Sequence, residues 1–365
     1  MNFYNKDKLK LISGVTEFAL YKSDILPDIA AYKYYEEYAE AIDAEVNKSV
    51  KGTFKSRLFN FAYINGYTIN GKAFIEGNSD VVKINDGVIY KIYATFSEMI
   101  LKGCFPEYTS SCSKSVNYTV RFSDEQGIEE IDLEYKAATD YNSKLLSEYL
   151  SMFATKFIIL HELAHHYNGH ILYLHYIFNK QNLDIKCEVD GVDPLTIQTL
   201  EMDADAFAIS QLTRELQYII INDDRLKSVV RSNEIIIGMF IFSLHCLFIL
   251  MNDGKDINYQ WEKNKYLPIV KRHLHNIACL ETNLKYQCND LYNSISFNDI
   301  AAYYIKLAES QYSTIFNYTS NFQDDFKAIT KDSSYTKKLE KTWNDLYPEL
   351  SKYARCPLNK PYDLD

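Results

Sequence analysis

Apolar residues recur at helical spacing along most of this chain. The spacing predicts helices over residues 27–46, between a cap at 85–86 and Gly103, over 142–168, from 193–194 onward and over 235–251. Residues from 297 onward also show a helical pattern, with mostly polar side chains. The chain is therefore predicted to be mostly helical.

Five short stretches have the composition of β-strands. They cover residues 59–67, 72–75, 80–84, 118–122 and 128–133. Asn-Gly pairs at 65–66 and 70–71 mark turns, and residues 124–127 are the turn expected between the last two strands. The predicted fold class is α+β, mostly helical, with a small mixed sheet and extra helices toward both ends.

The most apolar run of the chain is residues 235–251. Its seventeen residues fall short of the roughly 20 that a helix needs to cross a bilayer, and it contains Ser243 and His245. We expect a central buried helix and no membrane span. On that helix, His245 is predicted to be a core histidine with a hydrogen-bond partner.

Composition excludes some classes of protein. The 365 residues are 47% hydrophobic, which indicates a folded globular chain. The net charge of −10 argues against nucleic acid as the main partner, because no basic stripe is available to neutralise phosphates. Seven scattered cysteines without a Cys-x-x-Cys pair indicate free thiols, and the N-terminus has no apolar core long enough for a signal peptide. These features predict a cytoplasmic protein.

The predicted helix at 142–168 carries the motif His161-Glu162-x-x-His165. Four helical residues advance about 400°, so the two histidines lie one turn apart on the same face, as zinc binding requires. Glu162 lies about 100° round from His161, where a base could take a proton from a metal-bound water. Such a short motif also occurs by chance on surface helices. The four apolar residues at 157–160 favour a buried helix and hence zinc.

A third ligand is needed to complete the site. The pattern with a histidine six residues beyond His165 is absent, and His166 and His170 lie about 100° and 140° round the helix from His165. Glu201 and Asp205 are a better candidate pair because they are four residues apart. Small alanines at 204 and 208 would let a second helix lie close to the first. Taken alone, the two carboxylates would more often form a solvated acidic face.

Together the two motifs resemble those of the gluzincin metallopeptidases, which combine HExxH with a later ExxxD. The resemblance implies that His161, His165 and Glu201 bind one zinc ion per chain. It also implies that Glu162 is the general base and that Asp205 is the carboxylate that orients a ligand histidine.

Longer stretches narrow the resemblance. HELAHHYNGH followed by LEMDADAFA is most similar to the phage-exclusion (Lit-like) peptidase group, and the second stretch is also similar to the ImmA/IrrE peptidases. Residues 266–275 resemble the Pro-x-x-x-Arg segment of CAAX-processing and stress-related zinc peptidases, with Leu267 in place of a frequent histidine. Arg272, His273 or His275 could stabilise an oxyanion there, or the segment could be a surface turn.

The resemblance covers about residues 80–275 and implies a zincin-like catalytic core at 80–285. Residues 1–79 are then a helical and extended segment packed on that core, and residues 286–365 a C-terminal helical extension. The implied function is zinc-dependent hydrolysis of peptide bonds in a protein or peptide substrate. The Lit-like resemblance implies a role in phage exclusion, whereas ImmA/IrrE-like peptidases act on a repressor.

The alternative from another functional class is a metal-bearing binding module with weak hydrolysis, although the intact Glu162 argues against it.

In zincins that resemble this chain, a free strand edge along the cleft pairs with an extended substrate. Residues 80–84 could be that edge strand, or they could lie inside the sheet. The polar connection at 181–193 could reach over the cleft.

Overall fold

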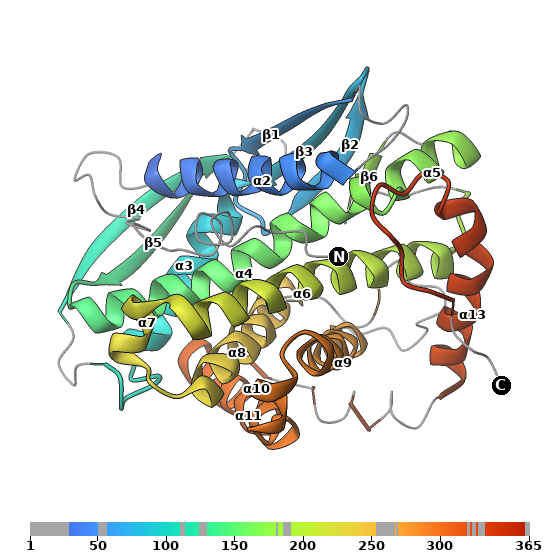
Figure 1. The fold of residues 1–365 in the computed structure, drawn as a ribbon. Helices are drawn as coiled ribbons and strands as arrows, with labels where there is room; N and C mark the ends of the chain where they lie inside the picture. The colour runs from blue at the N-terminus through green and yellow to red at the C-terminus, as the bar shows by residue number, and fades with distance from the viewer. Residues whose placement is uncertain are drawn as a thin grey trace.

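Helix α4 (Tyr141–Tyr167) runs through the middle of the computed structural model, and the other elements pack around it (Figure 1). Helices α3 (Asp86–Leu101), α6 (Pro194–Asn222) and α8 (Asn233–Asn252) contact it directly. The structure describes residues 29–49, 57–109, 114–123, 130–179, 182–184, 191–252, 267, 269–319, 322, 326–327 and 333–361. The predicted fold class is confirmed, because the molecule is mostly helical with a small mixed sheet beside α4.

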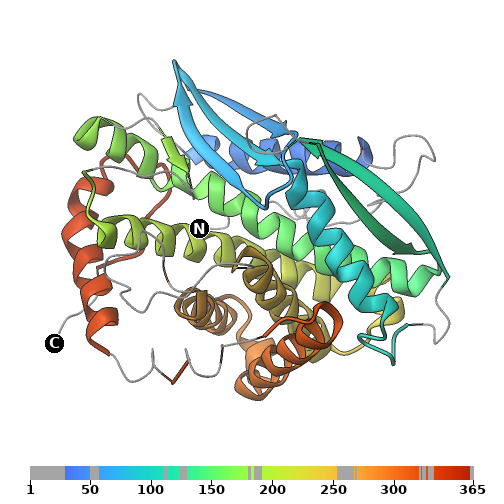
Figure 2. The ribbon, with the colours of Figure 1, turned by 180° about the vertical axis from the view of Figure 1, so that it is seen from behind.

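The remaining helices lie on both sides of α4. They are α2 (Ile29–Ser49), α5 (His170–Phe178), α7 (Asp224–Val229), α9 (Ile269–Gln287), α10 (Asn289–Asn293), α11 (Phe297–Phe316) and α13 (Ser333–Leu350). Figures 1 and 2 show α2 on the sheet side of α4, and α8, α9 and α11 on the opposite side.

The mixed sheet has the strand order β1-β3-β2-β6. Its strands are β1 (Leu58–Ile64), β2 (Gly71–Glu76), β3 (Ser79–Asn85) and β6 (Asn182–Asp184). β3 pairs with β1 in parallel and with β2 in antiparallel orientation, so it is an interior strand. The prediction of a free substrate edge at residues 80–84 is therefore wrong, because β1 occupies the side that would have been open. β6 arises within the stretch predicted as a polar connection.

The other two strands form a hairpin that packs against α3. They are β4 (Ser115–Ser123) and β5 (Glu130–Ala138), paired from Ser115–Ala138 to Ser123–Glu130. Both predicted strands are confirmed. The turn predicted at 124–127 lies outside the described residues.

The ends of α4 follow local chemistry. The Asp140 side chain accepts a hydrogen bond from the Ser143 backbone N–H at 3.0 Å, which caps the first turn. At the other end Gly169 has φ +81°, and a Cβ there would lie 2.6 Å from the Tyr353 carbonyl carbon. Glycine is needed both for this backbone conformation and for the close approach of the C-terminal segment. The predicted helix stop at Gly169 is confirmed.

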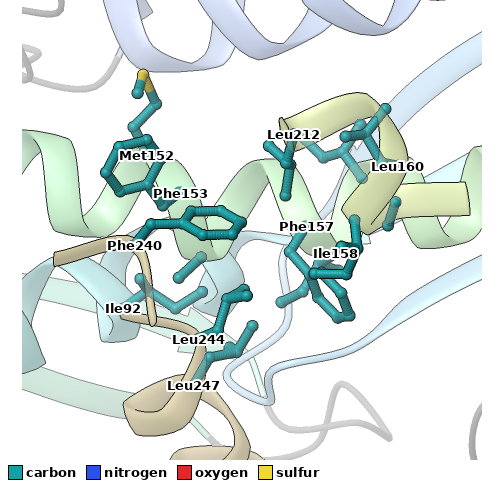
Figure 3. Packing of buried hydrophobic residues seen from close by; sticks show 14 of the residues in the cluster. Ile92, Met152, Phe153, Phe157, Ile158, Leu160, Leu212, Phe240, Leu244 and Leu247 are labelled. Atoms are coloured by element: carbon teal, nitrogen blue, oxygen red, sulfur yellow. The ribbon is translucent and has the colours of Figure 1, made fainter. Parts of the chain in front are cut away.

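The hydrophobic core lies between α4 and α8. Phe153 and Phe157 of α4 meet Phe240, Leu244 and other apolar residues of α8 (Figure 3). The Phe153 and Phe240 rings pack edge to face with centroids 5.3 Å apart. Within the described part of the chain, Asn233–Met251 alone is long and apolar enough to cross a membrane, and 78% of it is buried inside the protein. The prediction of a core helix at 235–251 is confirmed.

Three polar side-chain contacts fix helices to one another. His245 Nε2 lies 2.5 Å from Glu309 Oε1, so this core histidine has a partner as predicted. Lys156 of α4, fully buried, donates to Glu215 Oε2 of α6 at 2.8 Å. Tyr38 of α2 donates to the other oxygen of Glu215 at 2.6 Å, which joins α2 to the α4–α6 pair.

We predict that Glu148→Gln is more stable than the wild type, and that this difference in the free energy of unfolding grows as pH rises from about 4 to about 8. Glu148 is 2% exposed, and burial raises its pKa to about 8, with Lys144 acting in the opposite direction. The folded state keeps a proton that the unfolded chain releases near pH 4.3, so the free energy of unfolding falls by up to about 1.4 kcal/mol per pH unit across this window. Glutamine has no such proton.

Urea unfolding between about pH 4 and pH 9 checks this prediction. Glu36→Gln, at an exposed position of α2, is the matched control. The prediction fails if Glu148→Gln and the wild type lose stability in parallel as pH rises.

Candidate metal site

His161 and His165 lie one turn apart on α4 and face Glu201 of α6. Their Nε2 atoms are 3.2 Å apart, and Glu201 places its carboxylate oxygens 3.3 Å from His161 Nε2 and 3.4 Å from His165 Nε2. All three side chains are buried, and their nearest donor atoms lie within 4.8 Å of one another. This group could hold a metal ion.

Small residues bring the two helices close enough to form the group. Ala204 and Ala208 of α6 are fully buried, and α6 lies along α4 for most of its length (Figures 1 and 2). The predicted packing of a second helix against the first is confirmed, with both alanines buried.

The spacing of the donor atoms fits a tetrahedral ion. Two ligands about 2.0–2.2 Å from a tetrahedral zinc lie about 3.3–3.6 Å apart. The 3.2 Å between the two histidine Nε2 atoms is close to this range, and each Glu201 oxygen lies at a similar distance from one of the histidines, 3.3 Å for Oε2 to His161 and 3.4 Å for Oε1 to His165. Glu201 Oε2 is also buried and has no hydrogen-bond partner among the described residues, so a cation would satisfy it.

Asp205 holds His161 from behind. Its Oδ1 lies 2.8 Å from His161 Nδ1, so it favours a proton on Nδ1 and orients Nε2 toward His165 and Glu201. Arg272 of α9 donates to both oxygens of Asp205 at 2.6 Å, and Asn276 donates to Oδ2 at 3.2 Å. Burial would raise the pKa of Asp205, but Arg272 and His161 outweigh it and hold that pKa well below its usual range. Asp205 is therefore a buried carboxylate anion.

The carboxylates make the two histidines electrostatically different. Burial acts to lower the pKa of His161, but Glu201 and Asp205 outweigh it and raise that pKa to about 9. Burial and the neighbouring His161 and His170 lower the pKa of His165. A positive charge is therefore favoured on His161 and disfavoured on His165.

Glu162 is fully buried and packs against the first residue of β2. A Cβ on Gly71 would lie 2.6 Å from Glu162 Cγ and 2.8 Å from its Oε1. Any larger residue at position 71 would thus displace the carboxylate. The mixed sheet and α4 meet at this glycine.

His166 points to the sheet and not to the metal group. Its Nε2 lies 3.1 Å from the Val81 carbonyl oxygen, and its Nδ1 lies 3.6 Å from Asp80 Oδ1. Asp80 also binds Arg57 at 2.6 Å and Arg355 from the C-terminal segment. β3, which was considered as a substrate edge, instead anchors α4 and the C-terminal segment.

The three residues considered for oxyanion binding have different surroundings. They lie on helix α9, with Arg272 8% exposed and His273 fully buried, so the alternative of a surface turn is wrong. Arg272 joins the metal group through Asp205, and its Nη2 lies 3.3 Å from His161 Nδ1. The His273 ring instead packs against His245 with centroids 4.5 Å apart, and His275 Nε2 lies 3.6 Å from Cys279 Sγ. Tyr266 and Pro268 lie outside the described residues.

The sequence interpretation missed His170, Asp203 and Asn168. His170 Nδ1 lies 2.9 Å from His165 Nδ1, while its Nε2 lies 3.0 Å from Asp203 Oδ2. Asn168 donates to the same oxygen at 2.6 Å. A continuous helix would place His170 about 140° away from His165, but α4 ends at Tyr167 and the chain turns at Gly169. The predicted helix stop at Gly169 was the signal that could have revealed this contact.

The fold and the buried group define a helical α+β protein with a possible His/Glu metal site. Residues 120–286 match the model of the Peptidase U49 family, a family of Lit-like metallopeptidases, and this range includes all the residues of the metal group. The match supports a peptidase. A search of curated proteins found no match, and a search of solved structures found none either.

We predict that Arg272→Met destabilises the metal-free protein by about 3–5 kcal/mol, because it leaves the Asp205 charge buried without its main partner. The double variant Arg272→Met/Asp205→Asn should recover part of this loss, since it leaves no unpaired carboxylate. Urea unfolding at neutral pH measures both. A single variant as stable as the double variant, or as the wild type, would contradict the prediction.

Proposed function

We propose that this protein is a zinc-dependent endopeptidase in which His161, His165 and Glu201 hold one zinc ion. The observation that carries the proposal is the buried group of three side chains that can each offer a metal ligand, His161, His165 and Glu201, next to a buried Glu162. The Peptidase U49 match over residues 120–286 supports it independently.

The proposed chemistry is hydrolysis of a peptide bond. A zinc ion supplies positive charge that makes water more acidic and polarises a peptide carbonyl. Glu162 takes a proton from the attacking water as the new C–O bond forms, and it gives that proton to the amide nitrogen as the C–N bond breaks. Asp205 keeps His161 in the tautomer with Nε2 unprotonated, and Arg272 keeps Asp205 ionised.

The proposed substrate is a segment of another protein. A peptidase acts on proteins or peptides, and the formal net charge of −10 disfavours nucleic acid as the main partner. The similarity to the Lit-like group extends the proposal to phage exclusion, in which cleavage of a host protein serves an antiviral response.

Purified wild-type protein should contain about one zinc per chain, and His161→Ala and Glu201→Ala should lose it. Glu162→Gln should keep the metal, since Glu162 is not one of the three proposed ligands. Elemental analysis with a protein-concentration standard measures this. Full zinc occupancy in either ligand variant would refute the proposed ligand set.

Wild-type protein should create new protein N-termini in cells, and Glu162→Gln should reduce their formation by about 100-fold or more. Gly71→Ala should have a similar effect while keeping zinc, because its Cβ would overlap the Glu162 side chain. Proteome-wide N-terminal profiling of the matched strains measures the cleavage, and phage plating on the same strains tests the antiviral role.

Zinc content, measured on the same variants, shows whether a loss of cleavage comes from loss of the metal or from loss of the base. Cleavage by Glu162→Gln at the wild-type rate would exclude the proposed base. A wild-type protein that binds zinc but creates no new N-termini would contradict the peptidase and favour the metal-bearing binding module.

A further inference from the structure

Behind the proposed ligand His165 lies a second histidine, His170, which is itself held by Asp203. The His165–His170 contact is 2.9 Å between Nδ1 atoms, and the His170–Asp203 contact is 3.0 Å between Nε2 and Oδ2. His165 is 1% exposed, His170 is fully buried and Asp203 is 4% exposed. The three side chains form a continuous chain of hydrogen bonds that ends at the proposed metal position.

The hydrogen bonds limit where the protons can lie. An ionised carboxylate only accepts, so His170 must carry a proton on Nε2 and donate it to Asp203. With a metal on His165 Nε2, the ring proton of His165 must lie on Nδ1, and the Nδ1 lone pair of a neutral His170 ring would stand 2.9 Å away to accept it. This leaves the His165 Nε2 lone pair directed toward His161 and Glu201.

We infer that His170 and Asp203 are positioning residues that fix the tautomer and ring orientation of His165 for metal binding. The inference rests on the proposed zinc site. It gives His165 a support of the same kind that Asp205 gives His161, but through an imidazole in place of a direct carboxylate contact.

The backbone around position 169 places this support. Gly169 turns the chain so that His170, the first residue of α5, comes back against His165. Asn168, in the same turn, donates to Asp203 Oδ2 at 2.6 Å and fixes the carboxylate. The support therefore links the end of α4, the start of α5 and the middle of α6.

Asp203 also borders a cavity of about 430 Å³ on another side of α6. Asn168, Phe207, Arg214 and Cys356 line the same cavity. The cavity gives water room beside position 203, so a smaller side chain there can be accommodated. Asp203→Ala is for this reason a practical second variant.

The test measures zinc affinity by competition with a chromophoric chelator, together with the absorption spectrum of the cobalt-substituted protein. His170→Phe should weaken zinc binding by about 10–100-fold and change the cobalt spectrum, because phenylalanine cannot accept from His165. His170→Gln should restore much of the affinity, since its amide can both accept and donate. His175→Phe, on the same helix α5, is the matched control and should bind zinc like the wild type.

Asp203→Ala should weaken zinc binding in the same direction, by about tenfold, and it decides the question if His170→Phe does not fold. Wild-type zinc affinity in folded His170→Phe, or in Asp203→Ala when His170→Phe does not fold, overturns the inference while leaving the zinc site intact. Absence of zinc binding by the wild type itself would overturn both the proposed function and this inference.

Discussion

The close packing of α6 on α4 is the constraint on which the metal group depends. α4 supplies two histidines from one turn, but the third donor, Glu201, comes from α6. α6 also supplies both carboxylates that stand behind the histidines, Asp205 directly and Asp203 through His170. Because all three acidic residues lie within five positions of one helix, a shift of α6 along α4 would disturb the ligand and both supports together.

Buried ion pairs hold this arrangement. Arg272 joins α9 to Asp205, and Lys156 joins α4 to Glu215. Asp80 binds Arg57 from before β1 and Arg355 from beyond α13. Such pairs contribute little net stability compared with apolar packing, but removing one partner is costly, so they favour one arrangement of the helices over others. The ion pairs cross both proposed segment boundaries, at 79–80 and at 285–286.

The local sequence pattern predicted most of the helices and strands. The features that it did not predict depend on contacts between segments that are distant in the sequence. Strands β1 to β5, the helix stop at Gly169 and the buried helix at 235–251 follow from residue spacing and turn chemistry. The interior position of β3 could not be predicted, because it depends on parallel pairing with β1. Burial of Arg272 likewise depends on Asp205, 67 positions earlier. His170 was misjudged because a helical projection was continued past the glycine that ends the helix.

The polar residues of the HELAHH stretch are each held by a different part of the fold. His161 is held by Asp205 of α6, and Glu162 is confined by the Gly71 backbone of β2. His165 is supported by His170 of α5, and His166 is bound by the Val81 carbonyl of β3. A helix alone fixes only the spacing of these side chains. Their ring orientations, tautomers and burial require four neighbouring elements in fixed positions, and this explains why the short motif is informative only when its surroundings are known.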